Sequence, residues 1–471
     1  MASQQQENIE KFFAARVAEG GVVVRNAPRF DLDLYISNYR GRTRFERLLL
    51  IGRCSVPLCI DALKAAAREA KKGKDLQRYN DVCELLQAVC PDDAESQFDT
   101  NWAAATERTN IATTRQLEGE LKGYKNNLVK ESIRIAHREL GAHLESIGDL
   151  PGATEAYVKM RPDSSSQAHI TEVGRHLIKC LIQRRDWAGV LVNANKLMSG
   201  SASGNESNPE KPYQRMVSGL AYMGLERYAD AAKCFIDAGD PTHCQAYNDI
   251  ASVNDVAAYG GLLALATMDR AQLQSRVLDS PSFRNYLELE SHIRKAISMF
   301  ISGRYAACLA IVDAYSADYL LDLYLQPHTT NIISMIRSKC IIQYFVPFSC
   351  VTLESMNEAF GAPDWDLAAE LVSMIRQGQL RARINTIDKL LVAVSTDPRV
   401  AMQQQALQAA KEYQTQVLDR VRRMSLVAAK LRVKARKRRG DDTAGRNLPG
   451  ANEIFPQDKH GPADFGEQTA A

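Results

Sequence analysis

The sequence lacks the long apolar segment that a membrane-spanning protein needs. None of its apolar runs approaches the roughly 20 residues that cross a bilayer as a helix, and the first residues, MASQQQENIEKFF, do not place a basic segment before an apolar one. That order is typical of a secretory signal peptide. We therefore expect no membrane partner and no passage through the secretory pathway. The ten cysteines are interpreted as reduced thiols, which favours the cytoplasm and the nucleus as its location.

Catalytic and ligand-binding motifs are also missing. The sequence has no H-E-x-x-H or H-x-H zinc spacing and no phosphate-binding G-x-x-x-x-G-K-[ST], since Gly73-Lys74 lacks the upstream glycine. The run GSASG has Ala202 where a nucleophile elbow needs serine. His243 beside Cys244 comes nearest to a ligand pair, but no second pair matches it. We predict that the chain is not an enzyme and holds no metal or cofactor.

Net charge is small, at +3 for 471 residues, so a surface that is basic throughout is not expected. Charge is instead uneven near the end of the chain. Residues 430–439 hold seven basic side chains in ten, whereas residues 440–471 hold six acidic and two basic ones. The basic cluster has three interpretations: a nuclear-import signal, a tether for nucleic acid, or the solvated end of a helix.

Helical periodicity dominates from residue 30 onward, and part of it repeats. Residues 140–157 carry small and aromatic residues at the spacing of a tetratricopeptide helix pair, and residues 219–235 carry the same frame. Small residues let two crossing helices approach, and an aromatic side chain fills the gap to the next pair. We therefore predict a mainly α fold built on a right-handed tetratricopeptide-like solenoid. The matching positions, with weaker copies at 187 and 303–309, include Gly141, Gly148, Leu150, Ala153, Tyr157, Trp187, Gly219, Tyr228, Ala231, Phe235, Gly303 and Tyr305.

A short β-hairpin is predicted within residues 379–394, after three helices. Leu380, Ala382 and Ile384 alternate with polar residues, which is the period of a half-buried strand, and a second apolar run follows a polar turn. A hairpin after three helices is the arrangement of a winged helix. Its last strand is expected to offer an edge on which a partner strand pairs, and the candidate interface residues there are Leu390, Val392 and Val394.

One long helix is predicted over about residues 400–432. Its apolar residues recur at alternating spacings of three and four, which makes a narrow seam and not a broad core face. A seam on a terminal helix needs partner helices. The other candidate interface residues lie on this seam: Leu407, Ala410, Val417, Val421, Met424 and Leu431.

The charge on the third helix of a winged helix distinguishes DNA binding from protein binding. In a DNA-binding winged helix this helix enters the major groove, where basic side chains neutralise phosphates. Here the helix, 364–376, carries Asp364, Asp366 and Glu370 against Arg376 alone. Carboxylates repel phosphates, so we expect protein partners, and a nucleic-acid-binding winged helix stays as a distant alternative.

Four stretches resemble a known family. They are LYISNYRGRTRFERLLLIG near 34–52, LKGYKNNLVKESIRIAHRELGAHLESIGDLPGATEAYVKMR at 121–161, DVAAYGGLLALATMDRAQLQSRVLDSPSFRNYLELE at 255–290, and LDLYLQPHTTNIISMIRSKCIIQYFVPFSCVTLESM at 321–356. They are similar to the PCI-domain subunits of the proteasome lid, the COP-nine signalosome and translation initiation factor three. YGGLLALATMDR is more similar to the family of signalosome subunit one than to its proteasomal paralogue.

The resemblance implies a role and partners. It implies a non-catalytic scaffold subunit of the signalosome, joined to other PCI and MPN subunits through its winged helix and terminal helix. The family complex removes the ubiquitin-like modifier Nedd8 from cullin-RING ubiquitin ligases, its substrate, with a zinc isopeptidase in a separate MPN-type subunit. The alternative is a scaffold subunit of the proteasome lid.

These predictions divide the chain into five parts. They are a flexible N-terminal arm at 1–28, a helical-repeat domain at 29–240 with a flexible loop at 198–213, a PCI domain at 241–395 (helical part 241–325, winged helix 326–395), a bundle helix at 396–435 and a disordered tail at 436–471.

Overall fold

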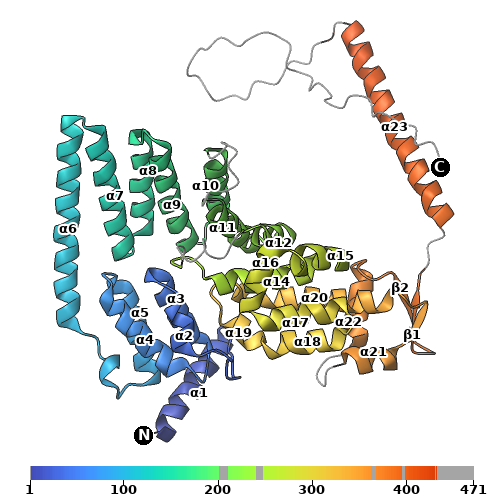
Figure 1. Cartoon of the computed structure of the whole chain (residues 1–471), viewed down its shortest axis with the longest axis horizontal. Helices are drawn as coiled ribbons and strands as arrows, with labels where there is room; N and C mark the ends of the chain where they lie inside the picture. Colours follow the sequence, from blue (N-terminus) through green and yellow to red (C-terminus); the bar gives the residue numbers. More distant parts are fainter. Residues whose placement is uncertain are drawn as a thin grey trace. The chain divides into compact units, whose positions relative to one another are not determined.

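The chain forms two units that are described separately, residues 1–394 and residues 395–471. A computed structural model describes residues 2–200, 210–239, 248–361, 367–394, 398–429 and 431. Figure 1 shows many helices and one small sheet in the first unit, and the helix α23 in the second, so the predicted mainly α fold with a small β element is confirmed. None of the described helices combines the length and apolar character needed to span a bilayer.

The first unit begins with a module of five helices that has its own core. The structure differs here from the predicted arm, because residues 2–18 form a helix, α1, whose Phe13 is buried in that core. The prediction missed this helix because its sequence is mostly polar and offers few apolar residues for a periodic pattern. The elements are α1 (Ala2–Ala18), α2 (Leu32–Ser37), α3 (Gly41–Cys54), α4 (Cys59–Lys72), α5 (Leu76–Val89) and the short turn η1 (Ala94–Ser96).

The next seven helices form successive packed pairs, as the repeat pattern predicts. They are α6 (Thr100–Asn127), α7 (Lys130–Ile147), α8 (Leu150–Met160), α9 (Gln167–Gln183), α10 (Trp187–Gly200), α11 (Glu210–Gly224) and α12 (Tyr228–Ile236), with the turn η2 (Arg161–Asp163) after α8. The predicted loop at 198–213 extends too far, because α11 begins at Glu210 and Tyr213 is buried. Residues 201–209 of that loop lie outside the described residues.

The repeat register is visible in the backbone. Leu150, Trp187, Tyr228 and Tyr305, which the sequence pattern aligns, are each the first residue of the second helix of a pair. The residue two positions earlier has a positive φ in all four cases. A left-handed residue ends the first helix and reverses the chain, and this is why the four turns share one length. These φ values are 98° at Gly148, 60° at Arg185, 61° at Glu226 and 77° at Gly303.

Small residues lie where the paired helices cross. A Cβ added to Gly141 would lie 2.6 Å from the ring of Tyr157, and a Cβ added to Gly219 would lie 2.8 Å from the ring of Phe235. Both pairs are separated by the same number of residues, so an aromatic ring of the second helix fills the place of a side chain on the first. Interiors packed this closely have no room for the extra carbon.

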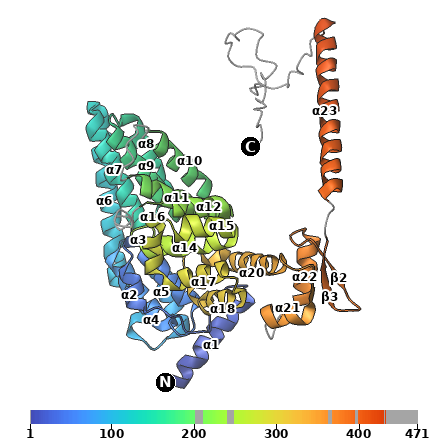
Figure 2. The same cartoon turned by 45° about the vertical axis from the view of Figure 1, so that its right-hand side comes forward.

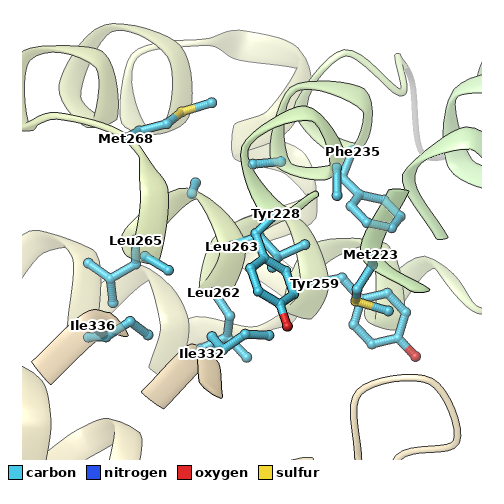
Figure 3. Close-up of a cluster of buried hydrophobic side chains, with 14 of the residues drawn as sticks. Met223, Tyr228, Phe235, Tyr259, Leu262, Leu263, Leu265, Met268, Ile332 and Ile336 are labelled. Atoms are coloured by element: carbon cyan, nitrogen blue, oxygen red, sulfur yellow. The ribbon is translucent and has the colours of Figure 1, made fainter. Parts of the chain in front are cut away.

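The helices that follow α12 continue the same core. Figure 3 shows Tyr228 of α12 beside Leu262 and Leu263 of α14, with Ile332 of α20 next to Leu262 and Ile336 of α20 next to Leu265. The predicted boundary between 240 and 241 therefore does not separate two cores. The elements are α14 (Val253–Thr267), α15 (Arg270–Gln272), the π-helical turn η4 (Leu273–Leu278), α16 (Pro281–Leu289), α17 (Ser291–Ile301), α18 (Tyr305–Ala314), α19 (Ser316–Leu320), η5 (Gln326–His328) and α20 (Thr329–Phe345).

A fully buried arginine joins the N-terminal module to α14 and to the segment after α19. Arg47 of α3 donates from Nη2 to Asp255 Oδ2 at 2.8 Å and from Nη1 to Asp322 Oδ2 at 2.6 Å. Its guanidinium carbon lies 4.0 Å from the ring centre of Tyr39, a cation–π geometry. The Tyr259 hydroxyl donates to Asp322 Oδ1 at 2.6 Å. Burial raises the pKa of Asp322, but Arg47 and these hydrogen bonds outweigh burial and hold that pKa below its usual value.

These residues come from stretches that carry the family resemblance. Tyr39 and Arg47 lie in the first stretch, Asp255 and Tyr259 in the third, and Asp322 in the fourth. Segments more than 200 residues apart in the sequence thus meet in one buried cluster, which we call the Arg47 cluster. It is a structural joint, because one guanidinium pairs with two carboxylates from distant segments inside the protein.

Candidate assembly site

The winged helix occupies the end of the first unit. Its elements are β1 (Cys350–Thr352), α21 (Leu353–Phe360), α22 (Leu367–Arg376), β2 (Ala382–Asn385) and β3 (Leu390–Ala393), and Figure 2 shows α21 and α22 beside the strands. Leu380 and Ala382 are buried and Ile384 is half-buried, while Arg381 and Arg383 are exposed. The alternation in the sequence therefore predicted this strand correctly.

The strand order corrects one prediction. The sheet order is β1-β3-β2, so β3 pairs with a strand on each side and offers no edge. The prediction that Leu390, Val392 and Val394 lie on an edge strand is wrong. Leu390 and Val392 are in the central strand, and the Val394 N–H donates to the Arg381 carbonyl. The edges are β1 and β2, and the prediction failed because the three-residue strand β1 has no sequence pattern of its own.

The wing tip carries an exposed apolar side chain that the sequence analysis missed. Ile387 is 90% exposed in the turn between β2 and β3. Asn385 fixes the turn: its Oδ1 accepts from the Ile387 N–H at 3.1 Å, and its Nδ2 donates to Asp388 Oδ2 at 2.7 Å. A single exposed apolar side chain is common on protein surfaces, so Ile387 is a candidate contact only in combination with the open edge of β2. The signal in the sequence is an apolar residue among turn-forming polar ones.

A groove of about 670 Å³ lies between α22 and the edge strand β2. Three of the side chains of α22 that line it, Ala368, Ala369 and Ser373, are small, which allows the backbone of a partner to come close there. Among the described residues β2 pairs with β3 alone, so its other side is open for a strand. The lining residues are Leu353, Ala368, Ala369, Val372, Ser373, Arg376, Gln377, Ile384 and Thr386.

The charge around this groove does not suit nucleic acid. Glu370 on α22 pairs with Arg337 of α20 at 3.0 Å, so that arginine is engaged inside the protein. Arg376, Arg381 and Arg383 are exposed cations near the groove, fewer than a phosphate backbone usually requires. Asp364 and Asp366, on which the sequence argument partly rests, lie outside the described residues. The groove is therefore suited to a protein surface.

The helix α23 (Pro398–Ala428) carries the predicted seam in the second unit. Its side chains lie in solvent, including large apolar ones that in a folded protein are usually buried. The predicted helix to residue 432 is slightly long, and the Leu431 N–H donates to the Leu426 carbonyl after the helix ends. The exposed fractions on the seam are 63% for Leu407, 36% for Val417, 55% for Val421, 71% for Met424 and 66% for Leu431, and Ala410 is also exposed.

Side chains that could bind a metal ion or act as nucleophiles are scattered in the described part of the chain. No cluster of three or more histidine, cysteine, aspartate or glutamate side chains there could hold a metal ion. Nine cysteines are free thiols, eight of them buried, and burial raises the pKa of several, Cys59 for example to about 12. His243 and Cys244, the basic cluster apart from Leu431, and the predicted tail at 436–471 lie outside the described residues.

Two family models match the sequence. The one described as 26S proteasome subunit RPN7 matches residues 99–276, from α6 into η4, and the one described as PCI domain matches residues 312–394, which include the winged helix. These matches agree with the order of repeats and winged helix in the structure.

Individual relatives are similar over most of the chain. A protein of Neurospora crassa named COP9 signalosome complex subunit 1 is 45% identical over 91% of this chain and 94% of its own length. Proteins of that name from Emericella nidulans and Arabidopsis thaliana are 43% and 34% identical, over 88% and 84% of this chain and 85% and 90% of their own lengths. A rice protein named 26S proteasome non-ATPase regulatory subunit 6 is 21% identical over 75% of this chain and 92% of its own length.

Proposed function

The chain belongs to the family of COP9 signalosome complex subunit 1, and from that membership we propose that it is a non-catalytic scaffold subunit of the signalosome. One observation carries the proposal: the similarity to these relatives runs through nearly the whole of both chains. The proteasome lid alternative is weaker, because the proteasomal relative shares less than half as much identity.

We propose two assembly surfaces. The first is the α22–β2 groove with Ile387 at the wing tip, where an open strand edge, three small side chains of α22 and an exposed isoleucine occur in one winged helix. The second is the seam of α23, which supplies an apolar stripe for a bundle of helices. The partners are other subunits of the complex, of the PCI and MPN types.

We further propose that the complex acts on cullin-RING ligases and removes Nedd8 from them, with the isopeptidase in an MPN subunit. In this proposal the chain holds other subunits in place and takes no part in the chemical step. A location in both cytoplasm and nucleus is part of this proposal, with the basic cluster at 430–439 as a candidate import signal.

Purification of the tagged chain from its own cells tests complex membership. Mass spectrometry of its companions should find other PCI subunits and one MPN metalloprotease. Recovery of proteasomal ATPases instead would assign the chain to the lid.

A seam variant tests the α23 surface. Val421→Asp with Met424→Asp should release the chain from the complex and leave the fold of residues 1–394 unchanged, because these side chains are already in water in the free chain. The control is Leu426→Asp, since Leu426 is exposed on the opposite face of α23. Comigration of the double variant with the intact complex on size exclusion would refute the seam.

A further inference from the structure

The turn between α6 and α7 presents a leucine that the folded chain does not use. Leu128 is 81% exposed, and it has φ 54°, in the left-handed region. That conformation favours glycine or asparagine and disfavours leucine. Asparagines occupy the two positions before it, 126 and 127, so the chain places its apolar residue at the strained position. Neither burial nor backbone conformation within the chain explains a leucine here.

Further apolar side chains extend the surface around Leu128. Val129 is 47% exposed and Tyr124, one helical turn before Leu128, is 39% exposed. Figure 1 shows where α6 and α7 join at this turn. We call Tyr124, Leu128 and Val129, with the lysines described next, the α6–α7 turn surface.

Positively charged side chains lie around the apolar ones. Lys122, Lys125 and Lys130 are exposed, and their amino groups make no hydrogen bond or ion pair with the residues that the structure describes. Glu131, the acid next to Lys130, already accepts from Arg134 Nη2 at 2.6 Å, and the nearest acids on α6 are Glu118 and Glu120, which lie further from Leu128 along the helix than Lys122 and Lys125. Residues 121–130 thus carry three lysines and no acidic side chain, which gives the turn a local positive potential.

The pKa of a buried histidine on α7 also reflects the positive charge of this surface. Burial is the main cause that lowers the pKa of His137 on α7, and the positive charges of Lys125 and Lys159 lower it further, against Asp163, which raises it. Lys159 on α8 is itself paired with Glu155 at 2.6 Å, so Lys125 is the cation of the turn that bears on His137.

We propose that the α6–α7 turn surface docks a protein segment that combines a cluster of aspartate or glutamate residues with a large apolar side chain. The apolar side chain would cover Leu128 and Val129, and the carboxylates would face Lys122, Lys125 and Lys130. A nucleic acid is a poorer match, since an exposed leucine and valine do not contribute to phosphate binding. The inference does not depend on membership of the signalosome.

The test uses fluorescent probes and the full-length chain. The first probe is an 18-residue amphipathic peptide with glutamate on one face and leucine on the other; the second has lysine in place of glutamate; the third is an 18-nucleotide oligo-dT. Fluorescence anisotropy should show binding of the acidic peptide that weakens with salt, and weaker binding of the other two. Equal affinity for the lysine peptide, or tighter binding of the oligonucleotide, would overturn the proposal.

Matched variants separate docking from folding. Leu128→Asn suits the left-handed backbone, so the melting temperature should stay unchanged or rise while peptide binding weakens about tenfold. Lys125→Glu should weaken binding and reduce its dependence on salt. The controls are Leu289→Asn, at another exposed leucine, and Lys295→Glu, at another exposed lysine, and neither should change peptide affinity. If Leu128→Asn binds the acidic peptide as the unaltered chain does, the proposal is wrong.

Discussion

Replacing Arg47 with methionine removes the cation that faces Asp255 and Asp322 inside the protein. Both carboxylates would then be buried without their ion-pair partner, at sites where the distances to Arg47 are now 2.8 and 2.6 Å. Breaking a buried ion pair from one side costs about 3–5 kcal/mol, because the remaining charge stays unpaired away from water. The complete burial of Arg47 and its two short contacts place the expected cost at the upper part of that range.

The assay must report on the joint between the N-terminal module and α14. A chain of 471 residues need not unfold in one step, so hydrogen exchange of α3 and α14 should accompany urea unfolding followed by circular dichroism. Arg47→Met should increase exchange in both helices. The control is Arg44→Met in the same helix, since the Arg44 side chain is 37% exposed and lies 3.7 Å from Glu69; it should cost less than about 1 kcal/mol.

A variant of the Arg47 cluster without formal charges tests whether the loss of stability comes from the unpaired carboxylates. Arg47→Met combined with Asp255→Asn and Asp322→Asn removes every formal charge of the Arg47 cluster, so it should recover at least half of the stability that Arg47→Met loses. Two results would refute the reasoning. One is a loss of less than about 1 kcal/mol in Arg47→Met. The other is a triple variant that is less stable than the single one.

Three further predictions concern the first unit. Gly141→Ala should lower stability by about 2 kcal/mol, because the methyl group would meet the Tyr157 ring, whereas Gly119→Ala in α6, where an added Cβ meets no atom within 4 Å, should raise it by up to about 1 kcal/mol. Tyr228→Ala should cost on the order of 3 kcal/mol in urea unfolding, and an unchanged midpoint would contradict the repeat register. Burial lowers the pKa of Lys339 from 10.5 to about 8. Between these values the unfolded chain holds more protons, so the stability of the unaltered chain relative to Lys339→Met should rise with pH by up to about 3 kcal/mol, since one pKa unit corresponds to about 1.4 kcal/mol.

The sequence predicted the elements whose signals are local. Gly141 with Tyr157 and Gly219 with Phe235 recur at one spacing, and the structure places each pair at a helix crossing. The alternation at 380–384 predicted the strand before the wing. These signals can be recognised in the sequence because residues a few positions apart lie on the same face of a helix or a strand.

The sequence analysis failed where the outcome depends on distant contacts. The short strand β1 pairs with β3 and turns a predicted edge into a central strand, and α1 becomes a docked helix because Phe13 finds a core made by later helices. Neither partner is visible in the local pattern. The candidate interface thereby moved from β3 to β2, Ile387 and the groove beside α22.

The sequence by itself determined the helical repeats, the winged helix, the terminal seam and the family, because periodicity and similarity are properties of the chain. The tertiary structure alone decided the strand order and the joint at Arg47. Arg47 lies 208 residues from Asp255 and 275 residues from Asp322, and no local pattern distinguishes it from Arg42 and Arg44, which are only half-buried. A buried charge is stable only where opposite charges reach it, and folding of distant segments onto one another brings them there.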